Sequence, residues 1–213
     1  MNFKRPRGTA DILPTEQTYW SHVYTTAHNV AEQFGYQRID TPTFEDTDLF
    51  QRGVGDGTDI VQKEMYSFED HGGDSITLRP EGTASVCRAY LENGLHNEPQ
   101  PVRLFYTAPM FHYERPQAGR MRQHHQFGCE AIGAPNPEVD AEVIELGWKY
   151  ISNLGIKNVS LKINTLGDPE GRVDYLSDLN KYFNTHINEL PKLDQDRLRR
   201  APLRVLDSKE KQT

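Results

Sequence analysis

The sequence predicts an α+β fold in which helices flank an antiparallel sheet. Three observations point to this fold class. Apolar residues recur at helical spacing in several segments, alternating β-rich runs lie between those segments, and consecutive runs are joined by short turns. Strands joined by short turns pair antiparallel. The 213 residues are enough to bury a hydrophobic core without a metal or disulfide staple.

The first predicted helix runs from Thr15 to Phe34, because its apolar residues recur every three or four positions. Thr15 is suited to cap the start of this helix, and Gly35 stands where a glycine commonly ends one. The next run, Tyr36–Asp40, alternates like a strand. It stops at Pro42, since proline cannot donate to a sheet ladder.

A hairpin is expected next, because residues 64–68 and 75–79 are β-rich and flank the turn pair Gly72-Gly73. A helix is predicted from 84 to about 93, closed by Gly94. The glycines between 53 and 57 lack G-x-G-x-x-G spacing, and we interpret that stretch as a loop.

A longer hairpin has predicted arms at residues 102–115 and 120–132, with residues 116–119 at its tip. Side chains two apart in a strand share a face. One face is therefore polar and carries His112, Glu114, Arg122, His124, Gln126 and Glu130. The other face is more apolar and carries His125, Phe127, Cys129 and Ala131.

Asn136-Pro137 opens another helix in the preferred order of N-cap and first-turn proline, and Gly155 ends it. Residues 159–165 alternate as a strand, and a helix from about 171 to 190 follows. Residues 191–213 are polar, and no closing element is expected there.

Composition excludes several classes of protein. The formal net charge of −7 argues against a general nucleic-acid coat. No apolar run approaches the ~20 residues that span a bilayer, and the N-terminus does not resemble a secretory signal. Two cysteines cannot form a disulfide framework. A cytoplasmic protein without membrane association is expected.

The long hairpin has an excess of positive charge, whereas the chain as a whole is negative. Residues 101–126 contain one acidic residue and four arginines, at Arg103, Arg115, Arg120 and Arg122. Such runs are commonly solvated surface. Here they adjoin a polar strand face that ends in a carboxylate, which suits a ligand carrying both a polyphosphate and a cationic group.

A second polar cluster spans Arg79–Thr83 at a strand-to-helix junction. Glu81 can accept from a ligand ammonium with help from Thr83, or it can simply support the first turn of the following helix. No metal site is predicted, because the histidines and Cys129 lack zinc spacing and alternate between faces. The sequence shows no Ser-His-Asp or Cys-His arrangement that would indicate a catalytic nucleophile.

The run Arg103–Glu130 closely resembles the second signature motif of the histidyl-tRNA synthetases, which are class II aminoacyl-tRNA synthetases. Residues 7–11, the helix and strand ending at Pro42 (the first, dimer-forming motif), residues 77–83 and residues 202–209 match in the same order. The resemblance implies a class II antiparallel sheet flanked by helices and incomplete at its C-terminal side. Residues 1–213 would form a partial catalytic domain, without the third motif or the anticodon-binding domain.

The resemblance also implies a ligase that activates histidine with ATP and transfers it to tRNA-His in protein biosynthesis. Mg²⁺ would accompany ATP, with no tightly bound cofactor and no metal held by the protein. A homodimer would form through the helix from Thr15 to Phe34 and the strand ending at Pro42. Catalysis would be positioning plus charge stabilisation, with no covalent enzyme intermediate.

Site residues carried over from the resemblance fall into overlapping sets. Histidine would be bound by Glu81, Thr83, His112, Gln126 and Glu130. ATP would be bound by Glu114, Arg120, Arg122 and His124. The catalytic set would be His112, Glu114 and Arg120. Within these sets, Glu130 would face the imidazole and His124 would stack on adenine.

His112 departs from the family pattern, which has an arginine there contacting the α-phosphate and the substrate carboxylate. Imidazole offers no bidentate fork, so weak or absent adenylation is predicted. This residue favours an alternative, a non-catalytic histidine-binding paralogue such as the regulatory subunit of ATP phosphoribosyltransferase. The retained Glu114, Arg120 and Arg122 oppose it. A purely structural, dimerising module is a third possibility.

Overall fold

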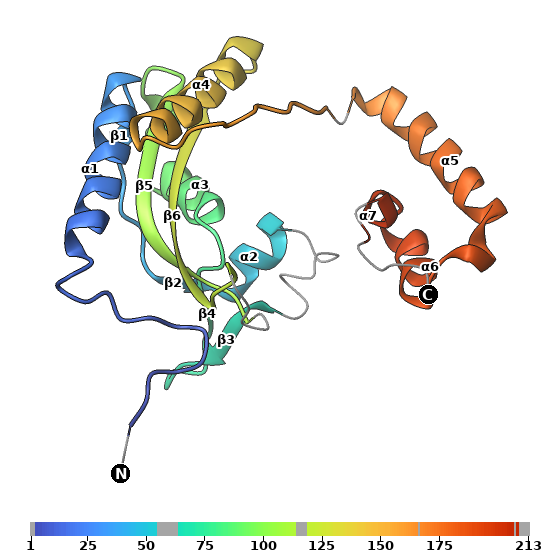
Figure 1. Cartoon of the computed structure of the whole chain (residues 1–213), viewed down its shortest axis with the longest axis horizontal. Helices are drawn as coiled ribbons and strands as arrows, with labels where there is room; N and C mark the ends of the chain where they lie inside the picture. The colour runs from blue at the N-terminus through green and yellow to red at the C-terminus, as the bar shows by residue number, and fades with distance from the viewer. Residues whose placement is uncertain (1–2, 55–63, 114–118, 166, 207, 209–213) are drawn as a thin grey trace. The chain divides into compact units, whose positions relative to one another are not determined.

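The computed structural model describes residues 3–54, 64–113, 119–165, 167–206 and 208. The chain forms two compact units, Met1–Asn158 and Val159–Thr213, and each is described by itself (Figure 1). Among the described residues, no helix combines the length and apolar character needed to span a membrane.

The central sheet of the first unit has the order β1-β5-β6 (Figure 1). Strands β5 (Val102–Phe111) and β6 (Gln123–Ile132) form the predicted long hairpin, with Met110 opposite His124 and Leu104 opposite Glu130. Both strands are shorter than predicted at the tip, so His112 and Arg122 lie just beyond their ends. Strand β1 (Gln37–Arg38) is shorter than predicted and pairs with β5 in parallel. The antiparallel prediction therefore holds for the hairpin but not for β1. The chain between β1 and β5 contains β2, α2, β3, β4 and α3, and a long connection of this kind allows parallel pairing.

The apolar face of this sheet packs against α1 (Gln17–Gln33) and α4 (Pro137–Asn153). The core there contains Val30, Ala31, Tyr36, Phe105 and Leu146, with Phe127 and Cys129 packed against it. The prediction that Phe127 and Cys129 lie on the apolar face is thus confirmed.

The predicted cap of α1 was wrong. The helix begins at Gln17, its cap position is Glu16, and the Glu16 carboxylate accepts from the Leu13 N–H instead of capping the helix. Gly35 follows the helix with φ +78°, a conformation that favours glycine, so the predicted end is confirmed.

Helix α3 (Thr83–Glu92) lies on the opposite side of the sheet from α1 (Figure 1). It is followed by a short 3₁₀ turn, η2 (Leu95–Asn97). Val86 from α3 packs against sheet residues Leu104, Tyr106, Ala108 and Met110. Helix α3 therefore covers part of the face that was predicted to be polar.

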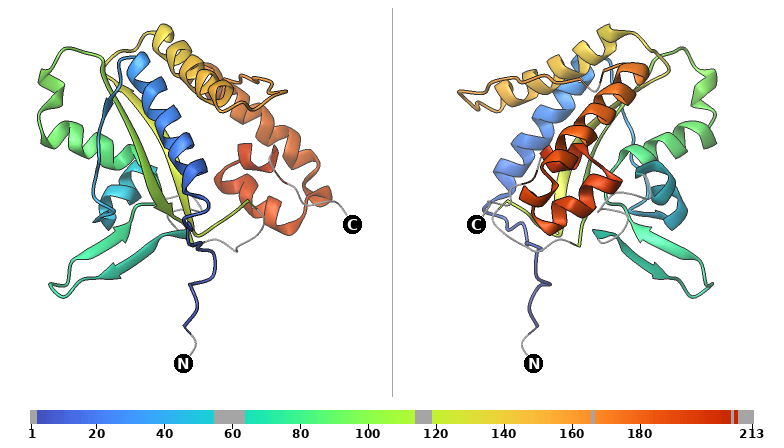
Figure 2. Two further views of the ribbon diagram at one scale, coloured as in Figure 1. Left: turned by 60° about the vertical axis from the view of Figure 1, so that its left-hand side comes forward. Right: turned by 90° about the vertical axis from the view of Figure 1, so that its right-hand side faces the viewer.

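A second sheet has the order β2-β4-β3. Strands β3 (Tyr66–Glu69) and β4 (Ser75–Leu78) form the predicted short hairpin, which projects from the unit (Figure 2). Strand β2 (Phe44–Asp46) and helix α2 (Thr47–Val54) were not predicted, because segments of three and eight residues are too short for a pattern to stand out. Residues 53 and 54 belong to α2 rather than to a loop, and residues 55–57 lie outside the described part of the chain.

Arg79 joins the two sheets. Its N–H donates to the Thr43 carbonyl (2.9 Å), and its own carbonyl accepts from the Phe111 N–H (3.0 Å). The side chain is only 5% exposed, and burial lowers the pKa of the guanidinium. Its N–H groups donate to three carbonyl oxygens, those of Thr41, Pro42 and Pro109.

The second unit contains α5 (Pro169–Thr185), η3 (Ile187–Glu189), α6 (Lys192–Arg200) and α7 (Leu203–Leu206). The expectation that residues 191–213 lack a closing element was wrong. Phe183, Leu198 and Val205 form a small core, and the buried Asp194 binds Arg197 and Ser208. The apolar residues of this segment are few and separated by charged ones, so they showed no helical spacing in the sequence. They pack together because the chain turns back toward α5.

The strand predicted at 159–165 was also wrong, since no strand forms there in the described structure. Leu161 is 54% exposed and Ile163 is 72% exposed. Alternation produces a strand only where a neighbouring strand supplies hydrogen-bond partners, and none of the described strands pairs with this segment.

We expect Arg79→Gln to lower the free energy of unfolding by about 3 kcal/mol, because buried carbonyl oxygens lose their donors. Urea denaturation measures this. The control Arg38→Gln removes an exposed pair with Asp40 (3.1 Å) and is expected to cost under about 0.5 kcal/mol. Equal denaturation midpoints for the two variants would show that Arg79 does not hold the sheets together.

Candidate active site

A polar cluster lies where the start of α3 meets the central sheet. The Thr83 hydroxyl donates to Oε1 of Glu130 (2.8 Å), although the two residues are 47 apart in the sequence. The Tyr106 hydroxyl donates to the same oxygen (3.3 Å). The cluster thus joins α3, β5 and β6 through one carboxylate.

Glu81 caps the start of α3. Its carboxylate accepts from the N–H groups of Thr83 (2.5 Å) and Ala84 (2.9 Å), as the helix-supporting interpretation predicted. Glu81 and Thr83 also line a cavity of about 840 Å³ between α2 and α3. Leu49, Cys87 and Leu91 make much of that cavity apolar.

Opposing effects act on Glu130. Burial raises the pKa of its carboxyl, and the nearby Glu81 charge acts in the same direction, whereas the hydrogen bonds from Thr83 and Tyr106 lower it. Burial also raises the pKa of the Tyr106 hydroxyl, with the Glu130 and Glu81 charges adding to the effect. The hydroxyl therefore stays protonated and remains a donor at neutral pH.

His124, Gln126 and Glu130 follow one another along one face of β6, as alternation predicted. Gln126 is exposed and stands opposite Ala108. The His112 Nε2 donates to the Pro80 carbonyl (2.7 Å), and its ring lies edge-on to the His124 ring at 5.2 Å between centroids. These two histidines therefore lie together beside the Pro80 turn.

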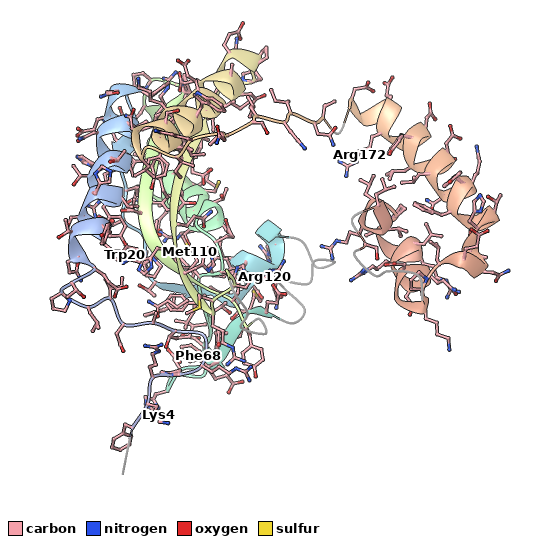
Figure 3. The ribbon with its side chains drawn as sticks, viewed as in Figure 1. Lys4, Trp20, Phe68, Met110, Arg120 and Arg172 are labelled. Carbon is pink, nitrogen blue, oxygen red and sulfur yellow. The ribbon has the colours of Figure 1, made fainter. Side chains whose placement is uncertain are left out.

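Arg122 is tied to the N-terminal segment. Its N–H donates to the Gly8 carbonyl (2.7 Å), and its guanidinium lies 4.1 Å above the ring of Tyr113. Arg120 precedes β6 and is exposed (Figure 3). Glu114, which the resemblance places at ATP, lies outside the described residues, as does most of the hairpin tip.

The opposite face of the sheet offers a smaller cavity of about 270 Å³, which Gln126 borders. Aromatic residues dominate it, and burial lowers the pKa of His125, which packs 4.7 Å from Trp20. The charged and polar side chains of the cluster lie on the Glu130 face instead. Within the described residues, no three His, Cys, Asp or Glu side chains gather as metal ligands.

Tyr106 is the site residue that the sequence did not predict. The one indirect indication in the sequence was Gly128, which stands opposite Tyr106 in the hairpin. A glycine inside a strand often marks a place where another group packs closely against the backbone.

Comparison with known proteins identifies the family. Residues 8–167 match the family model of histidyl-tRNA synthetase. The histidine–tRNA ligase of Dehalococcoides mccartyi is 53% identical over 210 residues, which cover 99% of this chain and 50% of that protein. The chain spans about half the length of the curated relatives it matches.

Solved structures agree. The apo histidyl-tRNA synthetase of S. aureus matches with a TM-score of 0.75 and 41% identity, over 97% of this chain and 49% of that one. A Bacillus halodurans structure described as an ATP phosphoribosyltransferase regulatory subunit/histidyl-tRNA synthetase matches with a TM-score of 0.67. At 22% identity over 92% of this chain and 54% of that one, it shows the fold alone. The family model and the identity shared along nearly the whole chain establish that this protein belongs to the histidyl-tRNA synthetase family.

Proposed function

We propose that this chain provides the histidine- and ATP-binding floor of a histidine–tRNA ligase, which activates histidine with ATP and transfers it to tRNA-His. The observation that carries the proposal is the Glu130 carboxylate, held by Thr83 and Tyr106 on the polar face of the central sheet. Membership of the family supports it.

Histidine binding needs acceptors for an ammonium and for an imidazole N–H. Glu81, Thr83 and Gln126 supply oxygen atoms for the ammonium end, and Glu130 accepts from the imidazole. Because Glu130 is half-buried, a hydrogen bond to its carboxylate is stronger than one made in bulk water.

ATP binding needs cations near the phosphates and a flat group for adenine. Arg120, Arg122 and Glu114 would engage ATP, His124 would stack on the base, and Mg²⁺ would enter with ATP as its counter-ion. The histidine carboxylate then attacks the α-phosphorus, and pyrophosphate leaves with its electron pair. The ribose hydroxyl of the tRNA end takes the histidyl group, and AMP leaves.

We further propose a cytoplasmic homodimer that uses α1 and the strand ending at Pro42. Tyr19 on α1 is 75% exposed, which leaves an aromatic side chain on the surface that a second copy would cover.

His112 supports a second candidate, a histidine-binding protein that does not adenylate. Its Nε2 is committed to the Pro80 carbonyl, and a single imidazole cannot replace a bidentate guanidinium on phosphate. Histidine binding without ATP binding, measured by calorimetry, would favour this candidate over the ligase.

We expect His112→Arg to raise histidine-dependent pyrophosphate exchange by roughly 10²–10³-fold, because an arginine restores a charge-assisted donor to the developing phosphate charge. The measurement uses this chain joined to the second half of the Dehalococcoides mccartyi ligase. His71→Arg adds the same charge at the exposed turn before β4 and is expected to change nothing. Equal exchange rates for the unsubstituted chain and the His112→Arg variant would refute the role given to His112.

We expect Glu130→Gln to stabilise the chain at pH 7 and to weaken histidine binding by roughly tenfold or more. The folded pKa of Glu130 lies above its ordinary value of 4.5, so ionisation costs stability. That cost is absent below pH 4.5 and is complete once the pH exceeds the folded pKa. The stability gain of the variant should therefore appear as pH rises.

Glu142→Gln is the matched control, because Arg103 lowers the pKa of Glu142. This variant should lose stability at pH 7, and its deficit should fade as the pH falls through the folded pKa. Thermal melts from about pH 2 to 8 compare the two variants, because the lowered pKa of Glu142 places its titration in the acid part of that range. If Glu130→Gln also lost stability at neutral pH, the burial cost assigned to Glu130 would be wrong.

A further inference from the structure

Tyr106 lies at the centre of the polar cluster and is 5% exposed. It stands opposite Gly128 in the β5–β6 register, so its side chain is on the same face as Glu130. Its hydroxyl donates to Oε1 of Glu130 at 3.3 Å. The contact crosses from one arm of the hairpin to the other.

Two glycines make room for the Tyr106 ring. A Cβ atom added at Gly82 or at Gly128 would lie 2.2 Å from the ring's Cζ, closer than real Cβ atoms come to other atoms. Gly82 has φ −100°, and Gly128 is not among the glycines with positive φ. Space rather than backbone conformation therefore requires glycine at both positions.

The Glu130 carboxylate is oriented by this arrangement. Thr83 and Tyr106 both donate to Oε1, and among the hydrogen bonds of the described residues none reaches Oε2. Two donors on one oxygen fix the plane of the carboxylate and leave the other oxygen to accept from a ligand.

The groups around Glu130 are mostly acidic. Those that interact with it are Glu81 ahead of α3, Cys87 on α3, Tyr106 on β5 and the adjacent Cys129 on β6. Thr83 and Tyr106 are the donors that favour the ionised form over the protonated one. Loss of either donor is therefore expected to make the carboxyl less acidic.

We propose that Tyr106, slotted between Gly82 and Gly128, is a positioning residue that holds the Glu130 carboxylate with one oxygen facing the ligand. The inference rests on the proposed function, since it takes the imidazole N–H of histidine as the ligand group. In this proposal Tyr106 acts through Glu130.

The test is Tyr106→Phe in the full 213-residue chain. Carboxyl ¹³C NMR follows the titration of Glu130, with the resonance assigned from Glu130→Gln. Calorimetry measures histidine affinity between about pH 5 and 8. We expect the Glu130 midpoint to move to higher pH, and histidine affinity to fall roughly tenfold near pH 6 and less near pH 8.

The control is Tyr36→Phe. It removes a hydroxyl from a similarly buried tyrosine that donates to Glu142 at 3.1 Å, and its ring lies in the core on the opposite face. Neither the Glu130 titration nor histidine affinity should change. Thr83→Val removes the other donor to Oε1 and should move the Glu130 midpoint in the same direction as Tyr106→Phe does.

An unchanged Glu130 titration in Tyr106→Phe overturns the proposal, even if histidine binds. A shifted titration in a chain that binds no histidine supports the positioning role and refutes the proposed function. A shifted titration together with a matching shift in the acid limb of histidine binding supports both.

Discussion

The buried guanidinium of Arg79 is the constraint on which the rest of the site depends. It joins the carbonyl groups of Thr41 and Pro42 to that of Pro109 in β5, and its main chain hydrogen-bonds to Thr43 and Phe111. Pro80, Glu81 and Gly82 follow it directly. The position of the His112 acceptor, the α3 cap and the slot for Tyr106 therefore all follow from where Arg79 is held.

Burial of the Glu130 carboxylate costs stability. A half-buried carboxylate beside another acid is costly, and the molecule offsets part of that cost with two donors on a single oxygen. In the function proposed above, the imidazole N–H of histidine would be a further donor to this carboxylate.

The other end of the polar face carries imidazole and guanidinium groups instead of carboxylates. His112 and His124 are rings set edge to face, and Arg122 is braced by Gly8 and Tyr113. An arginine at position 112 would place a fixed positive charge beside the Pro80 turn, whereas an imidazole hydrogen-bonded to a carbonyl contributes a dipole. The two side chains at position 112 thus differ in charge as well as in shape.

Sequence alone determined what local patterns encode: the hairpin arms and their two faces, the ends of helices at Gly35 and Gly155, and the signature run from Arg103 to Glu130. Tertiary structure decided the parallel pairing of β1, the small core around Phe183, the unpaired state of residues 159–165, and the place of Tyr106. Alternation and helical spacing are properties of neighbours in the chain, so they can be read directly. A contact such as Thr83 with Glu130 joins residues 47 apart, and only the folded chain brings their atoms within hydrogen-bonding distance.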